Sequence, residues 1–109
     1  MNWGVDKREH GRTGLIAEIL YRSNSPQLKA RISDISIGGV FVDTVNALEL
    51  GAVVQFSFDL PAEVSPDPVR GEGIVTWRQE MVGMGIQFTR MDLEDRERIK
   101  AYIEYAEQA

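Results

Sequence analysis

Hydrophobic and polar residues alternate in short runs along most of the chain. The clearest run has apolar residues at every second position from Val54 to Leu60, which is typical of a strand with one buried face. Runs rich in Val, Ile and Phe, separated by turn residues, occupy 15–22, 28–33, 39–44, 53–60, 73–78 and 83–88. Six short strands joined by short turns favour an antiparallel barrel or sandwich.

The period of the pattern changes at Asp92. Apolar residues then recur at helical spacing, and they are Ile99, Tyr102, Ile103 and Ala106. Asp92 can cap the helix, and no Gly or Pro interrupts the segment, so we expect a helix over 92–107. The proline-rich stretch 61–70 is interpreted as a loop between strands. The pattern predicts a mainly β fold closed by one C-terminal helix.

The composition is that of one globular domain: 109 residues, 43% hydrophobic and 27% charged. No apolar run approaches the roughly 20 residues of a membrane span, and the start of the chain has no signal-peptide pattern. We therefore expect a cytoplasmic protein without membrane insertion.

Most catalytic chemistry is disfavoured by the residue types present. The chain has no cysteine and one histidine, His10, so we expect no metal site, no catalytic residues and no cofactor. The Gly-x-Gly sequences at 71–73 and 83–85 lack the third glycine of a dinucleotide fingerprint. We interpret their glycines as strand positions that permit close packing.

Charge is unevenly distributed. Residues 1–33 carry six basic and three acidic side chains, whereas residues 34–109 carry six basic and fourteen acidic ones, and the net charge is -5. An acidic protein repels long polyanions, so DNA or RNA partners are not expected. A small anion held by a few arginines fits this distribution.

The first candidate motif is Arg8 and Arg12, in a basic segment 1–13 that we expect to be flexible and to precede a barrel domain over 14–109. A spacing of four places both guanidinium groups on one side of the segment, whether it is extended or helical. Guanidinium forks onto phosphate or onto the edge of guanine. Solvated arginines at this spacing are also common.

The second candidate motif runs from Asp34 to Gly39. In an extended chain Asp34 and Ser36 share one face, while Ile35 and Ile37 point to the core. Asp34 can accept from guanine and Ser36 can donate to an oxygen, while Gly38 and Gly39 permit positive φ and leave backbone N–H groups open to an anion. A β-turn capped by Ser or Asp is the alternative interpretation.

In this order the two motifs resemble those of the PilZ domain, a bacterial receptor module for cyclic di-GMP. The likeness extends through the later strands to the closing helix. It implies a six-stranded antiparallel β-barrel with a C-terminal helix. It also implies that cyclic di-GMP is bound by Arg8, Arg12, Asp34, Ser36 and Gly39, with Lys7 and Gly38 as additional contacts. Lysine before the motif favours a second bound nucleotide, although less firmly than arginine would.

Two functions are open at this point. The first is a non-enzymatic cyclic di-GMP effector, in which the ligand orders the N-terminal segment onto the barrel and presents a surface to a protein partner. Motility and biofilm formation are among the processes open to this family. The second is a nucleotide-free protein-interaction adaptor. A single-strand nucleic-acid binder is disfavoured by the net acidity and by the expected burial of Trp77.

Overall fold

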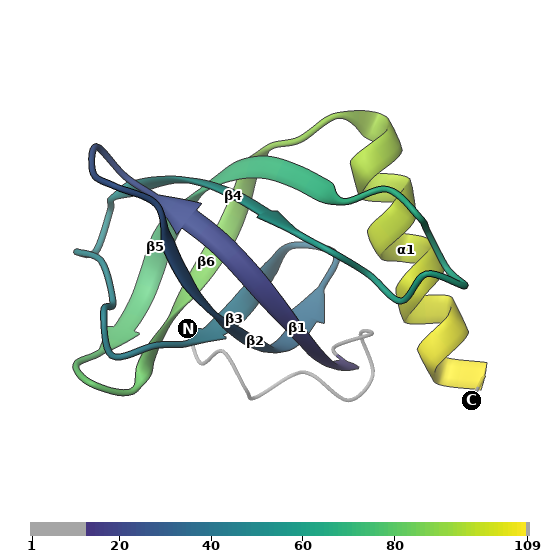
Figure 1. The fold of residues 1–109 in the computed structure, drawn as a ribbon, viewed down its shortest axis with the longest axis horizontal. Helices are drawn as coiled ribbons and strands as arrows, with labels where there is room; N and C mark the ends of the chain where they lie inside the picture. The colour runs from purple at the N-terminus through teal and green to yellow at the C-terminus, as the bar shows by residue number, and fades with distance from the viewer. Residues whose placement is uncertain (1–12, 109) are drawn as a thin grey trace.

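Six antiparallel strands and one helix make up residues 13–108, the part of the chain that the computed structural model describes. The elements are β1 (Thr13–Arg22), β2 (Leu28–Ser36), β3 (Gly39–Asp43), β4 (Val53–Phe58), β5 (Val69–Gln79), β6 (Gly83–Arg90) and α1 (Leu93–Gln108). The strand order is β1-β2-β3-β6-β5-β4, and β4 pairs with β1 to close a barrel (Figure 1). The predicted barrel with a C-terminal helix is confirmed.

Alternating side chains from all six strands fill the interior of the barrel. On β4, Val54, Phe56 and Phe58 are buried and Gln55 is exposed, as the alternation predicts. The fully buried side chains of the other strands include Ile19, Tyr21, Ile32, Ile35, Val40, Val42, Val69, Val75, Met84 and Ile86. Burial of one such side chain contributes about 1.5–3 kcal/mol before the entropy cost of ordering it. Because these side chains fill the interior, a ligand can bind only to the outer surface of the barrel, which we call the outer wall.

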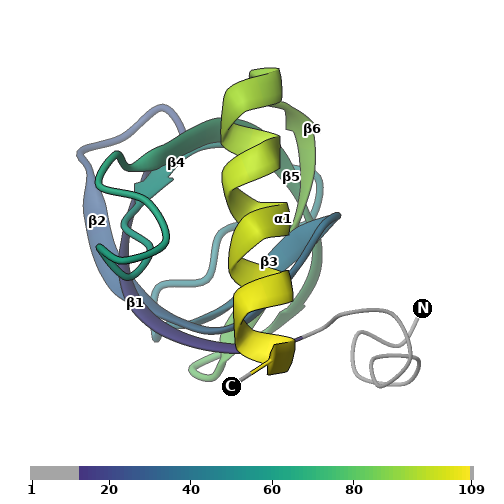
Figure 2. The same ribbon diagram turned by 90° about the vertical axis from the view of Figure 1, so that its right-hand side faces the viewer.

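The helix α1 lies across one mouth of the barrel (Figure 2). It begins at Leu93, one residue after the predicted start, and the carbonyl of Asp92 accepts a hydrogen bond from the Arg96 N–H at 3.1 Å. The predicted apolar stripe is confirmed, because Ile99, Tyr102 and Ile103 are buried and Ala106 is partly buried against the same core. Within residues 13–108, no helix is both long and apolar enough to cross a membrane.

A buried carboxylate fixes the start of α1 to β5. Asp95 Oδ1 accepts from Arg98 Nη1 at 2.8 Å and from the backbone N–H of Arg70 at 3.3 Å. The guanidinium of Arg98 also lies 3.6 Å from the carboxylate of Asp67. The helix, the strand and the loop before it are therefore held together by one polar cluster.

The strand β5 begins inside the region predicted to be a loop. Val69 pairs with Phe58 of β4 and is fully buried, so the loop is shorter than 61–70. The sequence does not predict the start of β5, because Gly71 and Gly73 follow it closely and glycine has low β propensity. A Cβ atom at Gly73 would collide with the backbone of Gln87, so close packing requires glycine there, as expected from the sequence.

A β-bulge at Ser33 sets the direction of the last residues of β2. The register with β3 shifts between Ile32 and Asp34, which leaves Ser33 as the extra residue. Ile32 and Ile35 are therefore both fully buried although they are three residues apart, and Asp34 is turned to the outer wall. The prediction that Ile37 lies in the core is wrong. It is 41% exposed, because the strand ends at Ser36 and the alternation stops.

Candidate functional site

The predicted ligand motif lies at the hairpin turn between β2 and β3. Asp34 and Ser36 are half-buried near the end of β2, Gly39 begins β3, and Gly38 lies in the turn between them. Ser36 pairs with Gly39 across the hairpin. The structure therefore brings these four residues together at one place on the outer wall.

The start of β1 lies directly beside this turn. Thr13 pairs with Ile35, and Gly14 pairs with Asp34. The basic residues assigned to the site lie outside the described residues, and they are Lys7, Arg8 and Arg12. They precede β1 in the chain, and β1 begins at Thr13 beside the turn.

The hydroxyl of Ser36 closes the turn. It accepts a hydrogen bond from the Gly38 N–H at 3.2 Å and donates to the Gly39 carbonyl at 3.4 Å, the latter a long bond. The Gly38 carbonyl accepts from the N–H of Phe88 on β6 at 2.8 Å. The interpretation of the segment as a turn capped by Ser36 is confirmed. Because a hydroxyl has one hydrogen to donate, a donation from Ser36 to a ligand oxygen would replace the bond to Gly39.

The expectation of positive φ at Gly38 or Gly39 is wrong. Among the glycines of residues 13–108, positive φ occurs at Gly51, where φ is 83°. The bonds made by Ser36 and Phe88 hold the turn without a left-handed residue. In the described part of the chain, a Cβ atom at Gly38 would meet no atom within 4 Å, so glycine leaves space beside the turn.

Two aromatic side chains extend the outer wall beyond Asp34. Phe41 pairs with Asp34 on one side and with Gly85 on the other, and Gly85 pairs with Trp77. The rings of Phe41 and Trp77 meet across Gly85, with centroids 5.1 Å apart and planes at 47°. Trp77 is half-buried on this wall rather than in the core, because a bulge between Val75 and Trp77 reverses the alternation. Sequence reasoning missed this pair.

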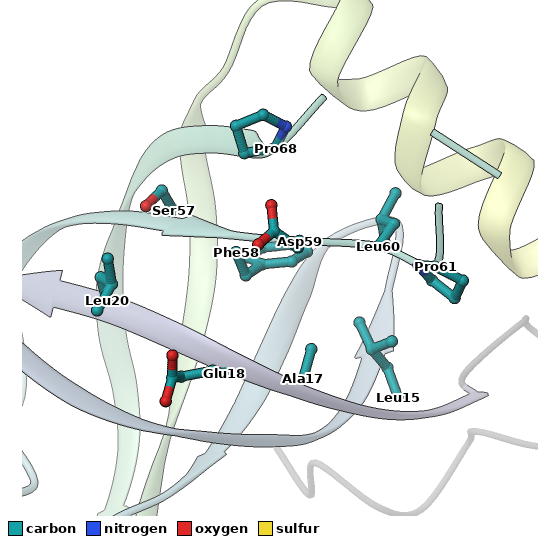
Figure 3. Close-up of a pocket in the computed structure, with 10 residues that line it drawn as sticks. All are labelled: Leu15, Ala17, Glu18, Leu20, Ser57, Phe58, Asp59, Leu60, Pro61 and Pro68. Atoms are coloured by element: carbon teal, nitrogen blue, oxygen red, sulfur yellow. The ribbon is translucent and has the colours of Figure 1, made fainter. Parts of the chain in front are cut away.

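A separate groove of about 340 Å³ lies between β1 and the segment that follows β4 (Figure 3). Its apolar lining includes Leu15, Leu60 and Pro61. Its two ionisable lining residues, Glu18 and Asp59, are both acidic. Carboxylates repel an anion. The β2–β3 turn is therefore the better candidate for an anionic ligand.

Comparison with protein families gives a match to the PilZ domain over residues 6–105. A comparison with curated proteins gives no match. Among solved structures, the chain is similar to the inhibitor of motility MotI/DgrA of Bacillus subtilis, with a TM-score of 0.71 and 17% identity. The similarity covers 95% of this chain and 51% of that protein, so this chain spans about half of its length.

Two further structures share the fold. PlzA of Borreliella burgdorferi, solved in complex with c-di-GMP, has a TM-score of 0.61 and 23% identity, over 79% of this chain and 32% of PlzA. The PilZ domain of CeSA from a cellulose-synthesizing bacterium has a TM-score of 0.65 and 15% identity, over 88% of this chain and 97% of that domain. At these identities the structures establish the fold alone.

Proposed function

The chain belongs to the PilZ domain family, and from this premise we propose that it is a non-enzymatic effector that binds cyclic di-GMP at the β2–β3 turn. The observation that carries the proposal is the start of β1 beside the Asp34 turn. The strand β1 begins one residue after Arg12, and its Gly14 pairs with Asp34. This connectivity supports the assignment of the arginine pair and the Asp34 turn to one site.

Asp34 is the residue that recognises guanine in this proposal. An ionised carboxylate offers two acceptor oxygens, which match the adjacent N1–H and N2–H donors of guanine. The neighbouring positions are open within residues 13–108, because a Cβ atom at Gly14 or at Gly38 would meet none of their atoms within 4 Å. A flat base can therefore approach the wall beside Asp34, and the Gly38–Gly39 turn lets a ligand approach the backbone closely.

Arg8 and Arg12 bind the phosphates and guanine of the nucleotide in this proposal. Two guanidinium groups that converge on one position repel each other, and a dianion removes that repulsion. Ligand binding therefore orders the residues before β1 against the barrel and creates a new surface for a protein partner. Lys7 adds a further cation for a second nucleotide.

The named neighbours support this ligand class and indicate the kind of output. PlzA was solved with c-di-GMP bound, and the other two are named for motility inhibition and for cellulose synthesis. Control of such bacterial surface processes through a protein partner is the output we propose. The second candidate, a nucleotide-free adaptor, is favoured by exposed apolar side chains far from the turn, among them Leu50 and Met81.

Titration calorimetry with cyclic di-GMP, cyclic di-AMP and GMP tests the proposal. Cyclic di-AMP keeps the ribose-phosphate ring without the guanine edge, and GMP keeps guanine without the cyclic dianion. Saturable binding of cyclic di-GMP alone supports an effector, and flat traces for all three overturn it in favour of the adaptor. Asp34→Ala should lose the preference for guanine. Asp43→Ala, an exposed acid at the other end of β3, is the matched control and should bind normally.

Trp77 provides a second readout. The chain has two tryptophans, so Trp3→Phe leaves Trp77 as the fluorescent reporter. Because Trp77 lies on the same outer wall as Asp34, two strands beyond Phe41, a nucleotide bound at the turn should change its emission. Unchanged emission at saturating ligand would place the nucleotide elsewhere.

A further inference from the structure

Exposed apolar side chains gather at the end of the barrel opposite α1. Of the eight large hydrophobic side chains that are exposed among residues 13–108, five belong to the β3–β4 loop, the start of β4 and the β5–β6 turn. These five form what we call the distal patch: Val45, Leu50, Val53, Met81 and Val82. Both the loop and the turn lie at the end away from the helix (Figure 1).

Backbone hydrogen bonds join the segments of the distal patch. The N–H of Thr44 donates to the carbonyl of Val82 at 3.2 Å, which ties the start of the β3–β4 loop to the β5–β6 turn. The N–H of Gly51 donates to the carbonyl of Val75 at 2.8 Å, which ties the end of that loop to β5. The patch is therefore built on a fixed backbone at one end of the barrel, and apolar surface gathered in this way marks interaction sites.

Met81 occupies a backbone position that its residue type rarely adopts. Its φ is 67°, in the left-handed region, and its side chain is 66% exposed. Asn24, in the β1–β2 turn, also has positive φ, but asparagine tolerates this region. Neither turn geometry nor core packing explains a methionine at residue 81. What it adds is a flexible, polarisable side chain directed outward, of the kind common on binding surfaces.

The exposed charges on the segments that carry the distal patch are acidic, while on the neighbouring strands the exposed Arg31 pairs with Asp43 and the exposed Arg22 pairs with Gln55 of β4. Segments 43–53 and 78–83 carry three exposed acids, and they are Asp43, Glu49 and Glu80. The one base of these segments, Arg78, is half-buried and donates to the Ala47 carbonyl at 3.2 Å beneath the loop. Two copies of the patch would bring acids against acids, whereas lysine and arginine on another protein would complement them.

We propose that the distal patch is a docking surface for a protein partner whose apolar contact residues are bordered by lysine and arginine. The patch lies at the opposite end of the barrel from α1 and shares no residue with the β2–β3 turn. It therefore provides a constitutive contact that does not depend on the proposed cyclic di-GMP site. Failure of nucleotide binding would leave it intact.

The proposal is tested with an amphipathic helical peptide made of leucine and lysine. The control peptide has the same pattern with glutamate in place of lysine. Titration into the ¹⁵N-labelled full chain without nucleotide should shift the amide signals of residues 43–53 and 79–83 with the lysine peptide only. Met81→Asn should weaken this binding about tenfold, as expected for a central contact residue. The same variant should keep or raise the melting temperature, because asparagine relieves the backbone strain.

Leu93→Ser is the matched control, because Leu93 is 71% exposed but lies at the start of α1. It should bind the peptide like the native chain. Equal affinity in the native and Met81→Asn proteins, or shifts spread over acidic surface outside the patch, would overturn the proposal by showing attraction through charge alone. Concentration-dependent self-association in sedimentation that Met81→Asn abolishes would overturn the choice of partner in favour of a second copy of the chain.

Discussion

The hydroxyl of Tyr102 on α1 donates a 2.6 Å hydrogen bond to the backbone carbonyl of Gly14, 88 residues earlier in the chain. Gly14 is also the residue that pairs with Asp34 at the candidate site. The helix α1 is therefore hydrogen-bonded to β1 at the residue that pairs with Asp34, the proposed guanine-binding residue. A displacement of the start of β1 would be transmitted to α1 through this bond.

Tyr102→Phe should lower the free energy of unfolding by about 1 kcal/mol, the usual net contribution of one such bond. The buried ring is retained in this variant, so the effect isolates the hydroxyl. Urea denaturation measures the change. Tyr105→Phe, in which the residue is 43% exposed, is the control and should have a smaller effect at neutral pH. An unchanged midpoint for Tyr102→Phe would show that the bond contributes nothing.

Arg8→Ala and Arg12→Ala should each weaken cyclic di-GMP binding by about 1.5–3 kcal/mol, the range for hydrogen bonds to charged groups, or roughly ten- to a hundredfold. Both residues precede β1, so the melting temperature should barely change. Calorimetry and thermal melts of the same samples separate the two effects. Native affinity in either variant would remove that arginine from the site, and a large loss of stability would assign it a structural role.

The two glycines of the turn should respond differently to substitution. Gly39 is buried and pairs with both Ser36 and Gln87, so Gly39→Val should overpack the hairpin, lower stability by about 1–3 kcal/mol and abolish binding. Gly38 faces open space, so Gly38→Ala should fold normally and weaken binding alone. Melting curves and nucleotide titrations are compared for both. Full affinity in Gly38→Ala would argue against close approach of the ligand to this turn.

Much of the fold follows from local patterns, and the parts that were missed depend on distant residues. The period-2 alternation of Val54, Phe56 and Phe58 predicts a half-buried strand, and it is one. The outward position of Trp77 is not predicted, because the bulge before it is set by the register with β6. A bulge depends on how two strands pair, and the alternation of apolar and polar residues within one strand does not show this pairing.

The same distinction applies to the candidate site. The motif from Asp34 to Gly39 is continuous in the chain, so its residue types and spacing are visible in the sequence. The Phe41–Trp77 pair is not, because it exists only where Gly85 of a third strand leaves room between the two rings. Sequence reasoning therefore predicts the polar part of the candidate site and misses the aromatic pair beside it.

The last prediction concerns the pH dependence of a contact between α1 and the loop after β4. Tyr105 Oη donates a 2.8 Å hydrogen bond to the carboxylate of Glu63. A hydrogen bond from its own backbone, and then the one from Tyr105, lower the pKa of Glu63 below its ordinary value of 4.5. The bond to Glu63 and the negative charge of that carboxylate raise the pKa of Tyr105 above 10.0.

These two shifts define the pH window in which the contact stabilises the fold. A carboxylate with a lowered pKa stabilises above 4.5, and this contribution is lost as the pH falls through its folded pKa. A tyrosine with a raised pKa stabilises below 10.0, and this contribution is lost as the pH rises through its folded pKa. Tyr105→Phe should therefore lower the melting temperature slightly near neutral pH, and this effect should shrink as the pH falls through the folded pKa of Glu63. A difference between the native and Tyr105→Phe proteins that stays constant from acid to neutral pH would assign the effect to ring packing against Tyr102, whose centroid is 6.3 Å away, instead of to the carboxylate.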